Sequence, residues 1–450
     1  MSNFLSPTLK PLVLTLTLAL LPAAVFASSD TPVSEYTLKN GMQVYVKVDK
    51  RAPVVVSQVW YKVGSAYETP GLSGIAHVME HMMFQGSKKY PENQFMQIVA
   101  DEGGQLNAFT QRDFTVFYEE LASDRLATSF KLEADRMQDL NLLPENFQKE
   151  IKVVMEERRL RVDDNPESVL LERVNAAAHL PDPYHHDPIG WMSDLKTMTD
   201  QDVRTFYQTW YTPNNAFLVV VGNVKPKDVF KLAKHYFGSI QGHPVPVLKP
   251  QTPPPFLGEQ DLNVNAPAKL PLLVMAYATP TLLDDQNSAD PYALIVLAGV
   301  LGGGESSRLQ HDLVRGSAIA SSIQVNYDPT TLFDDTLTIA VNPSPNHTVA
   351  ELRKAIEQEL NALQKNIIGN NELNRVKTSL ISQHLYDRDD LSTQATRLGS
   401  LIAVGLPWSV DDEYVAKINA VTADQVRAAA QYYLKPERLT VGVLNPLSIP

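Results

Sequence analysis

Two stretches of this chain, one in each half, share the same order of features, and this repeat constrains the fold more than any other pattern. The first runs through residues 193–224 and the second through residues 416–446. In each, a threonine precedes an amphipathic helix, which an aromatic pair, a proline turn and an apolar strand follow. With one constant offset, the identical pairs are Thr199 and Thr422, Val203 and Val426, Arg204 and Arg427, Gln208 and Gln431, and Pro213 and Pro436. Because these identical residues lie in elements that follow one another in the same order, they indicate an internal duplication of about half the mature chain.

A proline-rich segment at 242–259 separates the two copies. Proline interrupts helices and central strands, so this segment predicts an extended linker between two domains. Two or three domains are expected for 450 residues, because a single hydrophobic core seldom organises a chain of that length. We expect a signal peptide at 1–27, an N-terminal domain at 28–241, a linker at 242–265 and a homologous C-terminal domain at 266–450.

Alternating apolar and polar residues predict strands that are interspersed with long helices. The strand patterns are Met42–Val48, Val54–Val63, Phe114–Glu119 and Ala216–Val221. This mixture is typical of the α+β class. We therefore expect each domain to contain a mixed or antiparallel sheet with helices covering one of its faces.

The N-terminal segment at 1–27 has the features of a secretory signal peptide. Lys10 is the only charged residue before Asp30, and an apolar run at 12–21 follows it. Pro22 ends that run, and the residues up to Ala27 suit a signal peptidase. The run is shorter than the roughly 20 residues of a membrane-spanning helix, which argues against a retained anchor. The sequence thus predicts cleavage after Ala27 and an exported, periplasmic protein.

Composition excludes several kinds of site. The chain has no cysteine, so thiolate zinc sites, cysteine nucleophiles and disulfides are excluded, and any metal must be held by His, Asp or Glu. The formal net charge is -12, and removal of Lys10 with the signal peptide leaves 38 basic against 51 acidic residues, or -13. This acidic balance disfavours nucleic-acid binding, which needs a basic surface.

The helical segment Gly74–Phe84 contains the pattern His77-x-x-Glu80-His81. The two histidines have i,i+4 spacing, so both imidazoles project from one helix face and could hold one zinc ion. Glu80 lies beside them, where its carboxylate could deprotonate a zinc-bound water. The order is the reverse of His-Glu-x-x-His, which defines the inverzincin pattern. A surface histidine pair is the alternative, but the apolar surround indicates burial and hence a bound partner.

A third protein ligand is expected on the charged helix at 149–159. Residues at i,i+3 and i,i+4 spacing form one stripe of this helix: Glu150, Val153, Val154 and Glu157. Two carboxylates on such a stripe are costly to bury unless a metal or hydrogen bonds compensate. Glu156 instead faces Lys152 and resembles half of a solvated ion pair. A wholly exposed charged helix is the alternative interpretation.

With these motifs, essentially the whole mature chain resembles the pitrilysin, insulysin and mitochondrial processing peptidase family of zinc peptidases. Members carry a glutamate at a characteristic distance beyond the second histidine of the motif, and Glu157 has that spacing from His81 here. The resemblance implies that His77, His81 and Glu157 bind one zinc ion and that Glu80 is the catalytic base. It implies a supporting role for Glu150, two helical turns before the third ligand, and a clamshell of two domains around a substrate chamber.

A second matching segment starts at Gly103-Gly104 and continues through residues 105–110. By itself it is a glycine-rich turn that leads into a strand. The resemblance implies an exposed strand edge that pairs with the backbone of an extended, unfolded peptide. Asn107, Ala108 and Phe109 are then the expected substrate-binding residues.

The second copy departs from the first at the metal motif. By the offset of the repeat, Val300 is the equivalent of His77, so the C-terminal domain should hold no metal. In the family this half often carries an arginine followed by a tyrosine at i+7, which bind and polarise the substrate carbonyl. Arg315 fits the arginine as a catalytic residue, but Ser322 stands at the tyrosine position, and Tyr327 has the wrong strand parity to replace it. A partner subunit could supply the missing pair, so we expect a dimer, either of identical chains or with a paralogue.

Two hypotheses follow for function. The first is a zinc endopeptidase or oligopeptidase, and the second is a scaffold subunit that binds peptides without hydrolysing them. The intact Glu80 favours the enzyme, because a scaffold has no use for a base beside the metal. Histidines without ligand-like neighbours are interpreted as structural: His179, His185, His186, His347 and His384.

Overall fold

The computed structural model of the protein describes residues 32–180, 182–249, 258–284 and 288–448. The predicted signal peptide at 1–27, with its cleavage site after Ala27, lies outside these residues. Within the described ranges, no helix has the length and apolar character needed to cross a bilayer.

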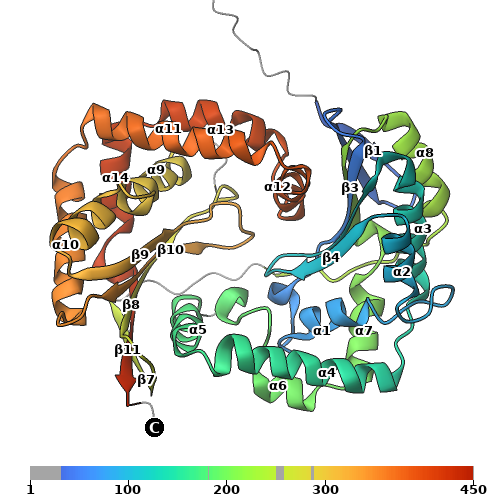
Figure 1. Ribbon diagram of the computed structural model, residues 1–450, viewed down its shortest axis with the longest axis horizontal. Helices are drawn as coiled ribbons and strands as arrows, with labels where there is room; N and C mark the ends of the chain where they lie inside the picture. Colours follow the sequence, from blue (N-terminus) through green and yellow to red (C-terminus); the bar gives the residue numbers. More distant parts are fainter. Residues whose placement is uncertain (1–31, 181, 250–257, 285–287, 449–450) are drawn as a thin grey trace, which may run out of the picture. The chain divides into compact units, whose positions relative to one another are not determined.

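The first half of the chain builds a six-stranded mixed sheet in the order β1-β2-β6-β3-β5-β4. Figure 1 labels β1, β3 and β4 of this sheet. Its strands are β1 Ser34–Thr37, β2 Gln43–Val48, β3 Val54–Tyr61, β4 Gln105–Thr110, β5 Thr115–Ala122 and β6 Ala216–Gly222. β2 and β6 run parallel, whereas the other neighbours are antiparallel. The four strands predicted from alternation are confirmed as β2, β3, β5 and β6, and β4 forms an edge of the sheet.

The helices described in this half, with the exception of the helix at 166–178, lie on and around its sheet. They are α1 Ile75–Met82, α2 Gln94–Asp101, α3 Leu126–Asp139, α4 Pro144–Arg158, α5 Pro166–Ala178, α6 Met192–Thr197, α7 Asp200–Trp210 and α8 Pro226–Tyr236. Alternate strand residues such as Val44, Val55 and Val220 form one buried core with residues of α1, α3, α4, α7 and α8. This core fixes α1 and α4, the two helices that carry the predicted metal ligands.

The second half builds a five-stranded sheet in the order β7-β11-β8-β10-β9. Its elements are β7 Gln260–Pro267, β8 Leu272–Thr279, α9 Asp290–Gly302, β9 Ala320–Asn326, β10 Asp335–Pro343, α10 Val349–Lys365, α11 Asn370–Asp387, α12 Leu391–Ala403, α13 Ser409–Ala420, α14 Ala423–Tyr433 and β11 Leu439–Leu447. The linker predicted for 242–265 is shorter than expected, because residues 260–265 pair with β11 as part of β7.

The duplication is visible in the element boundaries. α7 and α14 have the same length, and their first residues are separated by the same offset as Thr199 and Thr422. Both helices carry a complete capping box, made by Thr199 with Asp202 and by Thr422 with Gln425. The starts of β6 and β11 are separated by that offset as well. The predicted α+β class with two homologous halves is confirmed.

Each sheet is covered on both faces, not on one face as predicted. The second face of the first sheet, with Val56 and Trp60, packs against α12 from the other half. In return, Leu170 and Val174 of α5 pack on the second sheet. One helix of each half therefore packs on the sheet of the other half. The described residues from 32 onward form one compact unit.

Candidate metal centre and active site

The helix α1 is anchored at its N-terminus by a buried carboxylate. Gly74 precedes the helix with φ 88°, and an added Cβ there would come within 2.7 Å of the Ile189 carbonyl oxygen, so glycine is required. Glu68 accepts hydrogen bonds from the backbone N–H groups of Gly74 and Ala76, both at 2.8 Å. His186 Nε2 lies 2.8 Å from the same carboxylate. Glu68 thus satisfies two N–H groups that the first turn leaves unpaired.

The structure brings together the three predicted ligands from α1 and α4. His77, His81 and Glu157 each offer one ligand atom, and these atoms lie within 4.8 Å of one another. Glu157 Oε2 is 3.8 Å from His77 Nε2 and 3.4 Å from His81 Nε2. In the described part of the chain no other cluster of histidine and acidic side chains has this spacing. The five histidines interpreted as structural lie outside the cluster.

Glu150 lies where a supporting residue is expected. Its Oε2 is 3.1 Å from His81 Nδ1, and its Oε1 accepts a hydrogen bond from Gln85 at 3.0 Å. A carboxylate at Nδ1 favours the tautomer with the proton on that nitrogen, which leaves Nε2 as the electron-pair donor that faces Glu157.

Two details of α4 differ from the sequence analysis. Val153, predicted to share the buried stripe, is 49% exposed, whereas Val154 is fully buried. Glu156 is exposed as expected, but it pairs with Arg159 at 2.6 Å, not with Lys152.

The charges around the imidazoles suit a metal. Burial lowers the pKa of His77 to about 3, helped by the nearby His81 and Arg161, so this ring is neutral at ordinary pH. His77 Nδ1 is buried and has no hydrogen-bond partner among the described residues. Burial opposes charge on His81, but the Glu150 hydrogen bond and the adjacent carboxylates outweigh it and raise its pKa. Two imidazoles and one carboxylate are the donor set of three-ligand catalytic zinc sites, so the residues fit zinc, which would displace a proton from His81 on binding.

Glu80 points from the same helix but makes a different contact. Thr110 Oγ1, on β4, donates a hydrogen bond to Glu80 Oε2 at 2.5 Å. Burial raises the pKa of Glu80, while the Thr110 hydrogen bond and the neighbouring His81 act in the opposite direction. A partly desolvated carboxylate beside the candidate metal ligands is suited to accept and return a proton.

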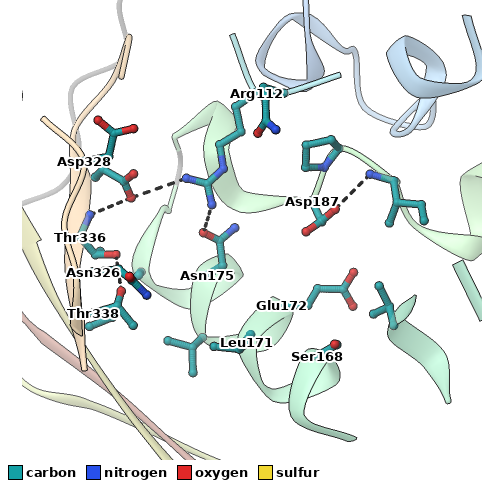
Figure 2. Close-up of a pocket in the computed structure, with 18 of the residues that line it drawn as sticks. Arg112, Ser168, Leu171, Glu172, Asn175, Asp187, Asn326, Asp328, Thr336 and Thr338 are labelled. Carbon is teal, nitrogen blue, oxygen red and sulfur yellow. Dashed lines mark hydrogen bonds and ion pairs between the residues drawn. The ribbon is translucent and has the colours of Figure 1, made fainter. Parts of the chain in front are cut away.

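A cavity of about 900 Å³ opens beside the cluster. His77, Thr110 and Arg161 line it on one side, and residues of the second half line it on another, among them Asn326, Tyr327, Asp328, Thr336 and Thr338. Figure 2 shows the Arg112 side chain extending toward Asn175 and toward the strand that carries Thr336 and Thr338. Arg112 donates to Asn175 at 2.7 Å and lies 3.6 Å from Asp335. The cavity is polar and spans both halves.

The predicted peptide-binding strand is an open edge. β4 pairs only with β5, so one side of its backbone has no neighbouring strand among the described residues. Asn107 is exposed on this strand. Phe109 instead directs its ring toward Trp60 and Phe114, with centroids 6.3 Å away in each case. Asn107 and the backbone of β4 are therefore accessible to a peptide, whereas the ring of Phe109 packs inward.

In the described part of the second half, no group of side chains corresponds to the candidate metal ligands of the first half. Val300 is fully buried within α9. Arg315 is not among the residues that line the cavity, and its guanidinium contacts Glu305 at 3.3 Å. Ser322 is exposed on β9 and donates to Asn342 at 2.7 Å. Tyr327 lines the cavity, but its hydroxyl already donates to the Pro280 carbonyl at 2.6 Å.

Some residues of the site were not found from the sequence. Arg161, in the π-helical turn Arg159–Asp163, contacts Glu157 Oε1 at 2.8 Å. Its i,i+4 spacing from Glu157 was an available signal. Thr110, Glu68 and His186 gave no signal of this kind in the sequence. Their side chains contact partners that lie far away in the sequence, or backbone N–H groups that no capping pattern would indicate.

Known proteins share this architecture. Residues 43–186 match the family described as insulinase (peptidase family M16), and residues 197–380 match the domain described as the peptidase M16 inactive domain. The chain is 32% identical over 434 residues to the zinc protease PqqE of Helicobacter pylori, covering 94% of this chain and 96% of that protein.

Two further relatives extend the comparison. The probable mitochondrial-processing peptidase subunit beta of Arabidopsis thaliana is 25% identical over 94% of this chain and 80% of that protein. The crystal structure of a protease from Helicobacter pylori superposes with a TM-score of 0.86 at 30% identity, covering 92% of this chain and 100% of that one. On these matches, which span both halves, the chain belongs to peptidase family M16.

Proposed function

We propose that this chain is a zinc-dependent endopeptidase or oligopeptidase that hydrolyses extended or unfolded peptides. The observation that carries the proposal is the cluster of His77, His81 and Glu157 beside Glu80, at the wall of a cavity that opens next to an unpaired strand edge. Homologues named zinc proteases support this assignment.

His77, His81 and Glu157 would hold one zinc ion, with Glu150 keeping His81 in the required tautomer. Zinc, when bound, acts as a Lewis acid toward the peptide carbonyl and makes water more acidic. Glu80 takes the proton from the attacking water at its carboxylate and returns it to the leaving amine. The β4 edge would hold the peptide backbone in extended form by β-augmentation.

A peptide-binding scaffold subunit is the alternative, and one finding favours it: residues 197–380 match a domain described as inactive. Most of that match lies in the half in which Val300 stands at the position of the first histidine. The first half retains both the metal cluster and Glu80, which is the arrangement that hydrolysis needs.

The substitution Glu80→Gln separates the two functions. Glutamine fills the same space but cannot accept a proton, so we expect zinc to remain near one per chain by elemental analysis. Hydrolysis of a fluorogenic peptide should fall at least ~100-fold, the usual size of a general-base contribution. Glu92→Gln, at an exposed position, serves as the matched control. Turnover by Glu80→Gln close to that of the control would show that Glu80 is not the base.

We also propose that the chain is exported to the periplasm, which rests on the signal-peptide features of residues 1–27. N-terminal sequencing of the protein from a periplasmic fraction should give Ser28 as its first residue. An uncleaved N-terminus in the cytoplasmic fraction would overturn this part of the proposal.

A further inference from the structure

Thr110 connects two parts of the site that have separate tasks. It is the last residue of β4, the open edge strand, and its side chain reaches Glu80 on α1. Leu106 and Ala108, earlier on the same strand, pack against the core that includes α1, whereas Phe109 belongs to the cluster on the opposite face. Because side chains alternate along a strand, Thr110 shares the face that looks toward α1.

The hydroxyl of Thr110 has only one proton to donate. Thr115 Oγ1, 3.5 Å away, is the other possible partner, but that distance is long for a hydrogen bond between hydroxyls. Thr115 already donates its own proton to the Val63 carbonyl at 2.9 Å. The proton of Thr110 is therefore directed to Glu80 Oε2 at 2.5 Å, a short contact of the charge-assisted kind.

One oxygen of Glu80 is thus engaged by Thr110, and the other is left for chemistry. A carboxylate that is held at one oxygen cannot rotate freely, so Oε1 keeps a fixed direction relative to the imidazoles on the same helix. Misorientation of a base is costly, because proton transfer requires hydrogen-bond distance to the reacting water.

We propose that Thr110 is a positioning residue, which orients Glu80 and ties the base to the strand that holds the peptide. The inference rests on the proposed function, because it needs Glu80 to act as base. It gives Thr110 no contact with zinc and no part in proton transfer. Its effect should fall on turnover, since the hydrogen bond does not contact the peptide.

The test compares Thr110→Val with Thr110→Ser. Valine has nearly the same shape but no hydroxyl, so we expect kcat to fall on the order of 10-fold or more, as for loss of a hydrogen bond to a charged group. KM and zinc content should remain within about twofold of wild type, allowing for the usual scatter of such effects. Serine restores the hydroxyl, so Thr110→Ser should recover most of kcat. Thr440→Val, a buried strand threonine in the second sheet, is the matched control and should be neutral.

The outcomes distinguish this inference from the proposed function. An active wild type, an inactive Glu80→Gln and a Thr110→Val with normal kcat would overturn the role of Thr110 alone. Equal losses in Thr110→Val and Thr110→Ser would also overturn it, because packing and not the hydroxyl would then matter. A wild-type chain with zinc but no hydrolysis, alone or paired, would overturn the proposed function itself.

Discussion

Each carboxylate of the candidate site has one oxygen held by a protein group. Glu157 offers Oε1 to Arg161 and Oε2 to the two imidazoles. Glu150 accepts from Gln85 at one oxygen and faces His81 with the other. Glu80 accepts from Thr110 in the same manner. The orientation of each carboxylate is therefore fixed before any ligand binds, which reduces the reorganisation that binding or chemistry would require.

At the level of single residues, the assignment of Glu157 as the third ligand can be tested by comparing it with its neighbour Glu156. Loss of a residue that only hydrogen-bonds to a metal ligand weakens metal binding roughly 10- to 100-fold. Loss of a direct ligand in Glu157→Gln should weaken zinc binding at least as much. Glu156→Gln should leave metal content and activity near wild type, because Glu156 is exposed and paired with Arg159. Zinc titration of the metal-free proteins gives the affinities. If the two variants exchanged behaviour, the assignment of Glu157 would be wrong.

Among the elements, α1 depends most on contacts from outside itself. Its first turn is held by Glu68, which His186 holds in turn, and its buried face includes Ile75 and Met79. The helix has only 8 residues, so it would not be stable as an isolated helix. The spacing of the candidate metal ligands therefore depends on the loops that carry Glu68 and His186.

The contribution of Glu68 is measurable by Glu68→Gln. A glutamine amide presents N–H groups toward donors, so at least one buried N–H of α1 or His186 loses its acceptor. We expect a loss of about 1–3 kcal/mol in the free energy of unfolding, measured by chemical denaturation. Zinc affinity should fall as well, because the helix that carries His77 and His81 begins there. Glu92→Gln, at an exposed position outside the helices, should change neither quantity; equal stability of the two variants would contradict the proposed capping role.

On the scale of the whole molecule, the exchange of helices makes the two halves interdependent. α12 covers Trp60 on the first sheet, and α5 covers the second sheet. Glycines allow both approaches: a Cβ at Gly399 would come within 2.1 Å of the Trp60 ring, and one at Gly442 within 2.2 Å of Val174. Neither half could bury its sheet without the other, so we expect cooperative unfolding.

Gly399→Ala tests this interface. The added methyl group has no room against Trp60, and overpacking of this kind costs about 1–3 kcal/mol. Gly369→Ala adds the same group where no described atom lies within 4 Å, so it should cost clearly less. Thermal and chemical unfolding of both variants would measure the difference. Similar stabilities would show that the contact between α12 and the first sheet is not tight in solution.

The prediction of a partner subunit also belongs to the scale of the whole molecule. Arg315 does not line the cavity, Ser322 occupies the expected tyrosine position, and the Tyr327 hydroxyl is engaged by Pro280. We therefore predict that a paralogue with an Arg/Tyr pair raises peptide hydrolysis on the order of 100-fold, the usual value of an oxyanion contact.

The comparison needs the isolated chain, the chain mixed with the paralogue, and Ser322→Tyr. Ser239→Tyr, at an exposed position of the first half, is the matched control. Full activity of the isolated chain, with no gain from the paralogue, would show that a monomer or homodimer suffices.

The sequence alone determined the features that follow from local periodicity. The i,i+4 spacing placed His77 and His81 on one helix face, and helix phase selected Glu150 and Glu157 over Glu156. The repeat identified the halves, since Thr199 and Thr422 cap equivalent helices. Such signals survive in a sequence because one helix or strand imposes a fixed geometry on residues a few positions apart.

Only the tertiary structure decided which distant residues complete the site. The contact of Thr110 with Glu80 spans 30 positions, and that of His186 with Glu68 spans 118. The packing of α12 on the first sheet joins residues of opposite halves, and the partly buried ring of Phe109 packs against Trp60 on the same face of that sheet. No spacing rule connects such pairs, because their separation depends on how whole elements pack together and not on the geometry of any one of them.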